Sequence, residues 1–458
     1  MKRRAVVAGG GVGGLLAARV LAEHFGTVTV IERDCCPVGR NPRAGAPQGR
    51  HVHVLLPSGV EALESLFPGC IAELVRDGAK RFDYGQSRIH TYGTWLPRVG
   101  TGLMALAQTR PFLEQHLHRW AGQVPNIEVI YGASVRAPFL DGSRSRAAGV
   151  EFSTGNSACV KRLEADLVVD ATGRNTRLLR WLDESGFGRV AESRMGIDLG
   201  YATGRFRVAR EYLPESALLY VVGPPPSQTK VGVIFQAEDG VVLAGLGGYH
   251  GDYPPADFAG FLQFARSLSQ PDIINVLARG ELCSCIERFR IPAPVRHRYR
   301  KVRNFPERLL PIGDSVCSLD PAFGQGMTLA AQEAKILARC LEEHPKLERS
   351  FTEEYFRRTD NVVDVAWGVS SRENLRYPQT MGVRPWYLPI ATRYMNLVMH
   401  AGDPQVAAEV YRVISLTASS KTVLRPSVAA RAMTAALKNG LRRMLHSFRK
   451  TWGNTDVT

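Results

Sequence analysis

A glycine-rich turn close to the amino terminus constrains the fold of this chain more than any other feature. Gly9-x-Gly11-x-x-Gly14 follows the apolar run 5–8 and leads directly into a stretch of strong helix formers. A second run of β-branched residues, 27–31, completes a predicted strand–helix–strand unit. In such a unit the glycines make the tight turn, let a pyrophosphate approach the backbone, and let the helix pack closely on the strand. The pattern therefore predicts a parallel α/β sheet with a dinucleotide site at its edge.

The other parts of a dinucleotide motif are also present. Glu32 ends the second predicted strand, 18 residues after Gly14, and a carboxylate at this place accepts hydrogen bonds from a ribose. The first turn of the helix offers free N–H groups and a positive dipole to phosphates. The residues that we expect at the cofactor from these features are Gly9, Gly11, Val12, Gly13, Gly14 and Glu32.

A second glycine loop, far along the chain, distinguishes between the two common dinucleotides. The apolar run 309–312 ends at Gly313-Asp314, and the sequence 324–328 then opens another helix-forming stretch. An NAD site needs no such element. A flavin uses a carboxylate for its ribityl hydroxyls and gains from a helix dipole near its N1 and C2 carbonyl, where negative charge gathers on reduction. The alternative role of Asp314 is an ordinary helix cap. The two loops together predict FAD.

Length and composition agree with a large globular protein. With 458 residues, of which 45% are apolar and 22% charged, the chain is long enough for ~2–3 domains and is neither disordered nor fibrous. No run of 18 apolar residues is present, which argues against a membrane span. The basic start has no small-residue cleavage site after it, so we interpret it as the first strand rather than a signal peptide, and we expect a cytoplasmic protein.

Cysteine and charge patterns exclude several other classes. The eight cysteines form no C-x-x-C pair, so we expect reduced thiols and no metal site. The net charge of +15 is concentrated in residues 288–308 and 425–458, which carry +7 and +6. Because no helix-turn-helix, RRM or zinc-finger pattern accompanies them, we expect no nucleic-acid binding. The two segments are either patches for anionic partners or solvated faces.

Four motifs, in this order, resemble those of the single-component (group A) flavoprotein monooxygenases, whose fold is of the p-hydroxybenzoate hydroxylase type. They are the glycine turn with Glu32-Arg33, Arg110 within 109–114, Asp170-Ala171-Thr172-Gly173-Arg174, and Gly313-Asp314 with Pro321 and 324–327. The motifs span residues 6–334. Two further stretches, 47–55 and 63–69, are similar to a bacterial subgroup that includes alkene epoxidases of polyether polyketide pathways.

The resemblance implies a role for each motif residue. Glu32 and Arg33 would contact the adenosine of FAD, and Val135 its adenine. Arg110 would reach the pyrophosphate or the ribityl chain, and Asp314 would hold the ribityl chain. The other residues that we expect at the cofactor are Arg50, Gly173, Gly324, Gly326 and Met327, of which the last three would line the isoalloxazine.

The predicted fold is α/β: a Rossmann-like FAD-binding domain that is interrupted by a β-sheet substrate domain and followed by a helical carboxyl-terminal region. The boundaries follow the change to alternating, turn-rich runs after residue 196. The assigned ranges are 1–75, 105–190 and 301–350 for the FAD-binding domain, 76–104 and 191–300 for the substrate domain, and 351–458 for the helical region.

By the same resemblance, the protein is an oxidoreductase in which reduced FAD forms a C4a-hydroperoxide with O₂ and transfers one oxygen atom to a small hydrophobic substrate. The product would be an epoxide or an alcohol of a secondary metabolite, free or carrier-bound. NADPH, NADH or an external flavin reductase supplies the electrons. The external reductase stays open because Thr172-Gly173 replaces the family's usual Asp-Gly, whose aspartate helps to bind the nicotinamide.

Two other kinds of flavin protein remain as alternatives. One is an alkene reductase of the geranylgeranyl reductase type, which shares the Asp-Ala-Thr-Gly run, and the other is a non-redox scaffold or cyclase. A flavin halogenase is disfavoured because the chain has no Trp-x-Trp sequence.

This chemistry does not demand a catalytic side chain. His51 and His53 alternate on an extended segment, so both face one side, either as a hydrogen-bond donor near the flavin or as structural histidines. Metal ligation by the pair is disfavoured. Arg40 and Arg50 are either close to the flavin phosphates or solvated. The side chains that either line the substrate pocket or belong to the core are Tyr84, Trp95 and Met104.

The segment 427–452 carries an apolar stripe at helical spacing, with Arg and Lys on its other faces. We favour a helix packed on the protein body over peripheral contact with an anionic membrane or an acidic carrier protein. The stripe consists of Ala429, Met433, Leu437, Leu441, Met444, Leu445, Phe448 and Trp452.

Overall fold

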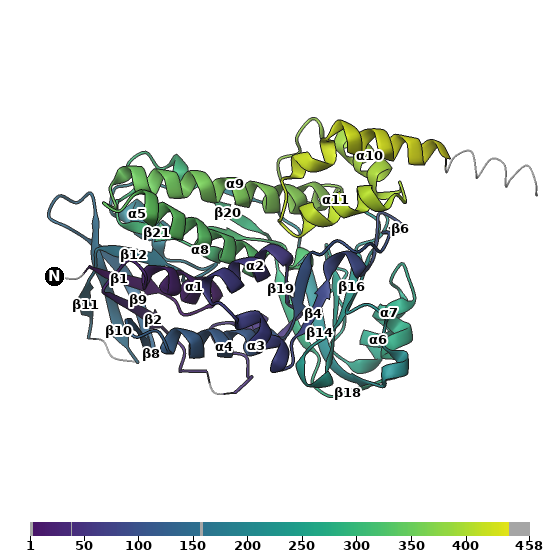
Figure 1. The fold of residues 1–458 in the computed structure, drawn as a ribbon, viewed down its shortest axis with the longest axis horizontal. Helices are drawn as coiled ribbons and strands as arrows, with labels where there is room; N and C mark the ends of the chain where they lie inside the picture. Colours follow the sequence, from purple (N-terminus) through teal and green to yellow (C-terminus); the bar gives the residue numbers. More distant parts are fainter. Residues whose placement is uncertain (1–2, 38, 156–158, 439–458) are drawn as a thin grey trace, which may run out of the picture.

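A five-stranded parallel sheet forms the centre of one lobe of the molecule (Figure 1). The computed structural model describes residues 3–37, 39–155 and 159–438. The strands of this sheet are β1 (Arg4–Ala8), β2 (Thr27–Glu32), β8 (Ile127–Tyr131), β12 (Leu167–Asp170) and β21 (Leu309–Pro311). Their order is β21-β12-β1-β2-β8, and every pairing is parallel. The predicted α/β fold with a Rossmann-like sheet is confirmed.

Two helices that are far apart in the sequence meet on this sheet. Residues 5–8 of β1 are all buried, as expected for a parallel strand that is covered on both faces. Helix α1 (Val12–Leu21) packs against α8 (Gly326–Glu343). Gly13 lies at this contact, where a Cβ would be in ordinary van der Waals contact with the Cβ of Ala330, at 3.4 Å. The packing brings the first turns of both helices to the same cavity. Helices α2 (Pro57–Leu66) and α9 (Arg349–Asn374) also contact α8.

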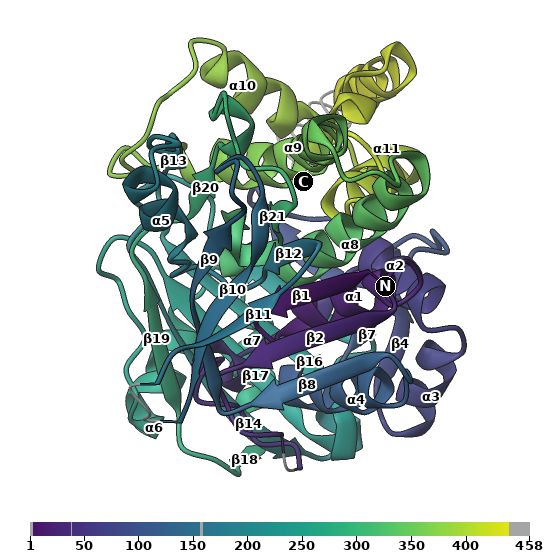
Figure 2. The ribbon, with the colours of Figure 1, turned by 90° about the vertical axis from the view of Figure 1, so that its left-hand side faces the viewer.

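A small antiparallel sheet connects β8 to β12. It consists of β9 (Ala133–Leu140), β10 (Ala147–Thr154) and β11 (Lys161–Glu164), in the order β11-β10-β9. Figure 2 shows this sheet beside the parallel strands, where β9 contacts β2 and β10 contacts β12. Helix α4 (Arg110–Gly122) packs on α1.

The second lobe is built on an eight-stranded sheet. Its strands are β5 (Arg88–Thr91), β6 (Thr94–Trp95), β14 (Leu199–Val208), β15 (Leu218–Val222), β16 (Lys230–Gln236), β17 (Val242–Gly248), β18 (Gly280–Leu282) and β19 (Glu287–Ile291). The order is β18-β14-β17-β16-β15-β5-β6, with β19 also on β14. Because β5 pairs in parallel with β15, two distant stretches of chain share the sheet. Helices α6 (Phe258–Arg266) and α7 (Asp272–Leu277) pack on it.

Shorter elements join the two lobes. The strands β3 (Val54–Leu55), β4 (Lys80–Asp83) and β7 (Met104–Ala107) form one three-stranded sheet, and β13 (Glu192–Arg194), β20 (Val295–His297) and β22 (Cys317–Ser318) form another. The remaining helices are η1 (Pro47–Arg50), α3 (Cys70–Arg76), η2 (Tyr84–Gln86), α5 (Leu178–Glu184), η3 (Arg210–Tyr212), η4 (Glu238–Gly240), η5 (Tyr299–Lys301), η6 (Gly313–Ser315) and η7 (Pro321–Phe323).

The carboxyl-terminal part is helical. After α9 follow α10 (Leu388–Met399), α11 (Pro404–Ile414), η8 (Ser420–Leu424) and helical residues 426–438. Of the predicted helix 427–452, residues 439–452 lie outside the described residues. The described part packs through Val428 and Ala432, whereas Met433 and Leu437 of the predicted stripe are exposed. Among the described residues, no helix is long and apolar enough to cross a membrane.

The basic segment 288–308 is not a uniform solvated patch. The Arg296 side chain is only 1% exposed and lies between Asp360 and Asp364 of α9, with 2.8 Å between its Nη2 and Asp360 Oδ1. Part of the positive charge that the sequence places here therefore holds α9 against the sheets.

Candidate functional site

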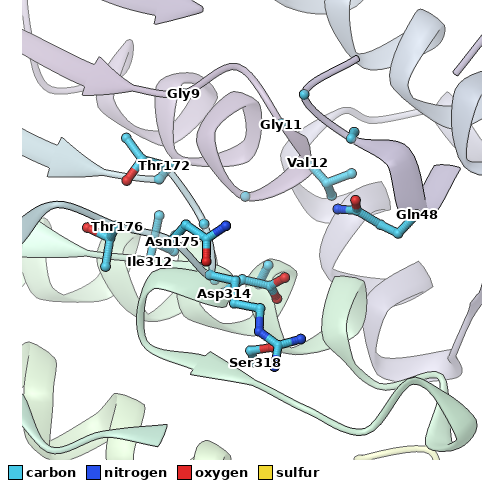
Figure 3. Close-up of a pocket in the computed structure, with 18 of the residues that line it drawn as sticks. Gly9, Gly11, Val12, Gln48, Thr172, Asn175, Thr176, Ile312, Asp314 and Ser318 are labelled. Carbon is cyan, nitrogen blue, oxygen red and sulfur yellow. The ribbon is translucent and has the colours of Figure 1, made fainter. Parts of the chain in front are cut away.

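A cavity of about 560 Å³ lies where the parallel strands end and the second lobe begins. Ligands of α/β proteins bind at this edge, outside the carboxyl ends of the strands. Figure 3 shows Gly11, Val12 and Gln48 on one side of the cavity and Thr172, Thr176, Ile312 and Asp314 on the other.

The cavity gathers most of the residues that the sequence predicts at the cofactor. Those that line it are Gly9, Gly11, Val12, Gly13, Glu32, Arg33, Arg110, Val135, Gly173, Asp314, Gly324, Gly326 and Met327, together with His51 and His53. Gly14 and Arg50 do not line it.

The glycines of the first turn have different roles. Gly9 has φ +105°, and a Cβ there would lie 2.5 Å from the carbonyl oxygen of Ala171. A Cβ at Gly14 would lie only 1.9 Å from the carbonyl oxygen of Gly9, so Gly14 serves the packing of helix on strand. At Gly11 the nearest atom, Arg43 Nη2, would be 3.9 Å away. This open side leaves room for a phosphate at the first turn of α1.

The end of β2 lies at the cavity, beside the first glycine turn. Glu32 Oε2 accepts a hydrogen bond from the Gly10 N–H at 2.6 Å, and Oε1 accepts one from the Asp34 N–H at 2.9 Å. Arg33 donates to the carbonyl oxygen of Gly45 at 2.9 Å. Val135 reaches the same cavity from β9.

Arg43 is a cavity residue that the sequence analysis did not identify. Its buried guanidinium lies 3.3 Å from Glu32 Oε1, 3.0 Å from Asp34 Oδ2 and 3.0 Å from Glu114 Oε2. Burial alone would lower its pKa, but the ion pairs with Glu114, Glu32 and Asp34 raise the pKa above the ordinary range. Through its ion pairs with these three carboxylates, Arg43 joins β2 and the loop that follows it to α4.

The two arginines that the sequence did single out in this loop lie elsewhere. Arg40 pairs with Asp239 at 2.5 Å, and Arg50 pairs with Glu287 at 2.9 Å. The side chains are 37% and 51% exposed, and neither residue lines the cavity. All three arginines belong to one Gly-, Pro- and Arg-rich stretch of the sequence. Only their contacts in the folded structure distinguish Arg43 from Arg40 and Arg50.

Arg110 reaches the cavity from the first position of α4. Thr109 caps this helix by accepting the Phe112 N–H at 3.3 Å. Arg110 Nε donates to Glu114 Oε1 at 2.9 Å, one turn further along. Burial would favour the neutral acid, yet Arg110 and Arg43 lower the pKa of Glu114 to about 2. Glu114 therefore stays charged and fixes both guanidinium groups.

Asp314 presents an unused carboxylate to the cavity. Asp314 follows β21 and comes directly after Gly313, whose φ is +67°. Its side chain lines the cavity and has no hydrogen-bond or ion-pair partner within the ranges that the structure describes. Burial raises its pKa, and the charges of Arg110 and Arg174 counteract the rise. Cavity-facing polar groups normally have a partner, so this carboxylate is suited to ligand hydroxyls.

The first turn of α8 stands next to Asp314. Gly324 has φ +65°, and Gly326 and Met327 line the cavity where α8 begins. A Cβ at Gly326 would be 3.9 Å from Asp314 Oδ1, so the backbone is open on this side. The free N–H groups of a helix start favour a ligand atom that carries negative charge. The donor set, the free carboxylate and the open glycine turn fit FAD.

The Asp-Ala-Thr-Gly turn is stabilised from within. The buried Asp170 accepts the Thr172 N–H at 3.0 Å, the Thr172 hydroxyl at 2.5 Å and the Thr176 hydroxyl. Burial raises the pKa of Asp170, and these hydrogen bonds oppose the rise. Thr172 and Gly173 both line the cavity. Thr172 stands where the group A monooxygenases usually have an aspartate, and its hydroxyl is already bound to Asp170 within the turn.

The second lobe supplies an aromatic wall. Tyr201 on β14, Phe289 and Ile291 on β19, and the buried His51 line the cavity. The His51 ring lies edge-on to Tyr201, with 4.5 Å between ring centroids, and its Nδ1 is 2.9 Å from Thr203 Oγ1. Tyr84, Trp95 and Met104, which the sequence offered for this wall, do not line the cavity.

Both predicted histidines face the cavity, and burial keeps them neutral. Burial, followed by the nearby charges of His53 and Arg50, lowers the pKa of His51 to about 3. His53 Nδ1 is 3.0 Å from the carbonyl oxygen of His51, and burial lowers its pKa to about 4.

The buried His51 should make stability depend on pH. Its pKa is about 6.5 in the unfolded chain and about 3 in the folded one, so its contribution is complete above pH 6.5 and is lost as the pH falls toward 3. Between pH 7 and pH 5 the free energy of unfolding of the wild type should fall by about 2 kcal/mol more than that of His51→Asn. Urea unfolding at both pH values measures the difference. The exposed His400→Asn is the control and should follow the wild type; identical losses in wild type and His51→Asn would contradict a buried neutral His51.

Potential metal ligands gather elsewhere. In the part of the chain that the structure describes, one group of three such side chains is present: Glu73, Asp77 and His116. His116 Nε2 lies 2.9 Å from Asp77, and Glu73 accepts hydrogen bonds from Arg119 and Trp120. These side chains already partner one another and the protein, and none of them lines the cavity.

Solved structures with the same fold include two monooxygenases and a Diels-Alderase. PqsL of Pseudomonas aeruginosa, a probable FAD-dependent monooxygenase, aligns with a TM-score of 0.63 and 16% identity over 82% of this chain and 97% of that one. The p-nitrophenol 4-monooxygenase PnpA of Pseudomonas putida aligns with a TM-score of 0.65 and 17% identity over 92% and 99%. The Diels-Alderase PyrE3 of pyrroindomycin biosynthesis also aligns, with a TM-score of 0.60 and 16% identity over 90% and 80%.

Sequence relatives identify the family of the chain. No family model matches the chain. The kynurenine 3-monooxygenase of Salinispora tropica is 24% identical over 364 residues, or 75% of this chain and 74% of that protein. The chain therefore has the fold of the FAD-dependent monooxygenases. Among proteins related in sequence, it belongs to the family of Protein Rv3254 of Mycobacterium tuberculosis, with 30% identity over 455 residues that cover 96% of this chain and 95% of the relative.

Proposed function

We propose that the protein inserts one oxygen atom from O₂ into a small hydrophobic substrate, by epoxidation or hydroxylation, with FAD as its cofactor. The observation that carries the proposal is that one cavity joins two kinds of wall. The glycine turn, the unpartnered Asp314 carboxylate and the start of α8 form one wall, and aromatic side chains of the second lobe form the other.

Each wall has a separate task. FAD, when bound, supplies the redox chemistry. Asp314 would hold the ribityl hydroxyls, Arg110 would neutralise phosphate charge, and the helix start would attract the end of the flavin that gains negative charge. Tyr201 and Phe289 would orient the substrate and exclude water. Exclusion of water prevents side reactions of reactive intermediates.

The aromatic wall supports a planar or unsaturated substrate. Tyr201, Phe289, Ile291 and neutral His51 offer apolar surface and few charges on this side. The relatives' names point to aromatic amines and phenols, and the stretch 47–55 suggests alkenes, so both classes belong in a substrate screen. A substrate that is delivered on a carrier stays within the proposal.

The hydrogen bond of Thr172 supports an external source of electrons. Its hydroxyl is used by Asp170, so it does not replace the carboxylate with which the family helps to bind a nicotinamide. We therefore propose that an external flavin reductase assists the protein, and that NADPH and NADH act only slowly on their own.

Anaerobic reduction followed by oxygen tests the proposal. FAD-loaded protein is mixed with NADPH, then NADH, then NADH with a flavin reductase, while the flavin absorbance is followed. We expect rapid bleaching only with the reductase, and then transfer of label from ¹⁸O₂ into an alkene or phenol. Product that forms without oxygen would indicate an alkene reductase instead, and product that forms without any reductant would indicate a cyclase.

A further inference from the structure

Five large apolar side chains project from one short segment before and within α10. They are Met381, Val383, Trp386, Tyr387 and Ile390, here called the apolar ridge. Val383 is 92% exposed and Trp386 is 84% exposed. Single exposed apolar residues are common, but five large ones within residues 381–390 are typical of an interaction site. The cavity and the proposed reaction do not use the ridge.

The ridge is held in place by the protein. The Arg384 guanidinium donates to the carbonyl oxygens of Tyr377, Pro378 and Thr380, at 2.9, 3.0 and 2.9 Å. Met381 exchanges two backbone hydrogen bonds with Gly196, at 2.7 and 3.1 Å. A fixed segment that exposes its apolar side chains loses little further conformational freedom when it docks.

The charge around the ridge is positive. No Asp or Glu occurs between Glu373 and Asp403, whereas Arg376, Arg384 and Arg393 lie in this stretch. Arg376 pairs with Glu373. The exposed Arg384 and Arg393 have no carboxylate within ion-pair distance in the described ranges. Tryptophan and tyrosine beside arginine are the side chains that favour the boundary between lipid headgroups and acyl chains.

The ridge is connected to the cavity through a short path. The residues on either side of Gly196 lie between β13 and β14. The Ile197 N–H donates to the carbonyl oxygen of Pro292 at 3.1 Å, and the Met195 N–H donates to that of Pro294 at 3.2 Å. Ile291, one residue before this segment, lines the cavity. A surface that holds the ridge would therefore lie close to the wall at which we place the hydrophobic substrate.

We propose that the apolar ridge docks the protein on the surface of an anionic lipid bilayer. The apolar side chains would enter the headgroup region, and Arg384 and Arg393 would face anionic headgroups. A second copy of the chain fits less well, because a two-fold contact through this patch brings each Arg393 to the same basic surface of its partner. Docking does not depend on the proposed reaction and can be measured without a substrate.

Vesicle sedimentation with the full-length, FAD-loaded protein tests the docking. The vesicles contain phosphatidylcholine alone or phosphatidylcholine with phosphatidylglycerol. We expect binding to the anionic vesicles that is about tenfold weaker in Val383→Ser/Trp386→Ser, since these exposed side chains carry much of the buried apolar area. Arg393→Gln should weaken binding to anionic vesicles only. The control is Val75→Ser on α3, which is 40% exposed and lies far from α10 in Figures 1 and 2; its binding should equal that of the wild type.

Each other outcome overturns the proposal. Equal binding of wild type and the double variant would assign membrane contact to another surface, such as the basic carboxyl-terminal segment. Absence of binding to either kind of vesicle would exclude docking of the protein on a lipid bilayer. A wild-type dimer in analytical ultracentrifugation that the double variant loses would assign the ridge to a second copy. The flavin spectrum and thermal unfolding of each variant show whether the fold is retained.

Discussion

Arg43→Ala should lower the free energy of unfolding by about 3–5 kcal/mol, because removal of one member of a buried ion network leaves the others unpaired. Arg43 lies within 3.3 Å of Glu32, Asp34 and Glu114. Glu114 would keep Arg110, but Glu32 would lose its cation beside the first glycine turn. Denaturant unfolding of the apoprotein and holoprotein measures the loss.

Two arginines of the same loop serve as controls for this prediction. Arg40→Ala and Arg50→Ala each remove one exposed ion pair, and such pairs contribute about 0–1 kcal/mol. If all three variants lost equal stability, the buried network would not be what holds this loop.

The pH dependence separates lost charge pairing from lost packing. The pKa of Glu114 is about 2 in the folded protein, below its unfolded value, so its stabilising contribution is present at neutral pH and is lost as the pH falls through 4 toward 2. In Arg43→Ala the pKa of Glu114 should rise. The stability difference between wild type and Arg43→Ala should therefore narrow as the pH is lowered below about 4.5; a difference that stays constant would indicate packing alone.

The sequence predicts those parts of the fold and site that depend on local order. Gly9, Gly11, Glu32 and Asp314 follow or end strands of the sheet, and parallel strands end at one edge. Their spacing along the chain is therefore enough to predict that they meet at one cavity. Arg110 is predicted only by the resemblance of its motif, and the structure places it at the start of α4.

The sequence could not predict what depends on contacts between distant segments. Arg43, Arg40 and Arg50 share one loop, and only the positions of Glu114, Asp239 and Glu287 decide which arginine is buried. Tyr201 and Phe289 lie on β14 and β19, whose sequence patterns resemble those of other strands in the sheet. Only the pairing of the strands decides that these two side chains face the cavity.

The carboxyl-terminal helix shows the same limit. Its stripe at helical spacing includes Met433 and Leu437, which are exposed, while the neighbouring Val428 and Ala432 are buried. The spacing of apolar residues identifies a helix and its apolar side. Which face of the helix is buried depends on the surface against which it packs. Arg296 makes the corresponding point for charge, because two aspartates of α9 turn a residue of a basic run into part of the interior.

Asp314→Ala should weaken FAD binding by about 10–150-fold, or about 1.5–3 kcal/mol, because a charged acceptor for ligand hydroxyls is removed. Asp314 lines the cavity beside the start of α8 and has no other partner among the described residues. Titration of the apoprotein with FAD, followed by the quenching of flavin fluorescence, gives the dissociation constant without any assay of activity. Asp314→Asn keeps one carbonyl acceptor and should lose less.

Stability should move in the opposite direction to affinity in this variant. Burial raises the pKa of Asp314, which means that the apoprotein holds its charge at a cost, so Asp314→Ala should leave the apoprotein as stable as the wild type or more stable. Asp239→Ala, which removes an exposed carboxylate outside the cavity, is the matched control and should bind FAD as the wild type does. Unchanged affinity in Asp314→Ala would place the ribityl chain away from this loop. Lower affinity together with lower stability would instead indicate a structural defect. Only a loss of affinity with stability retained assigns Asp314 to the cofactor.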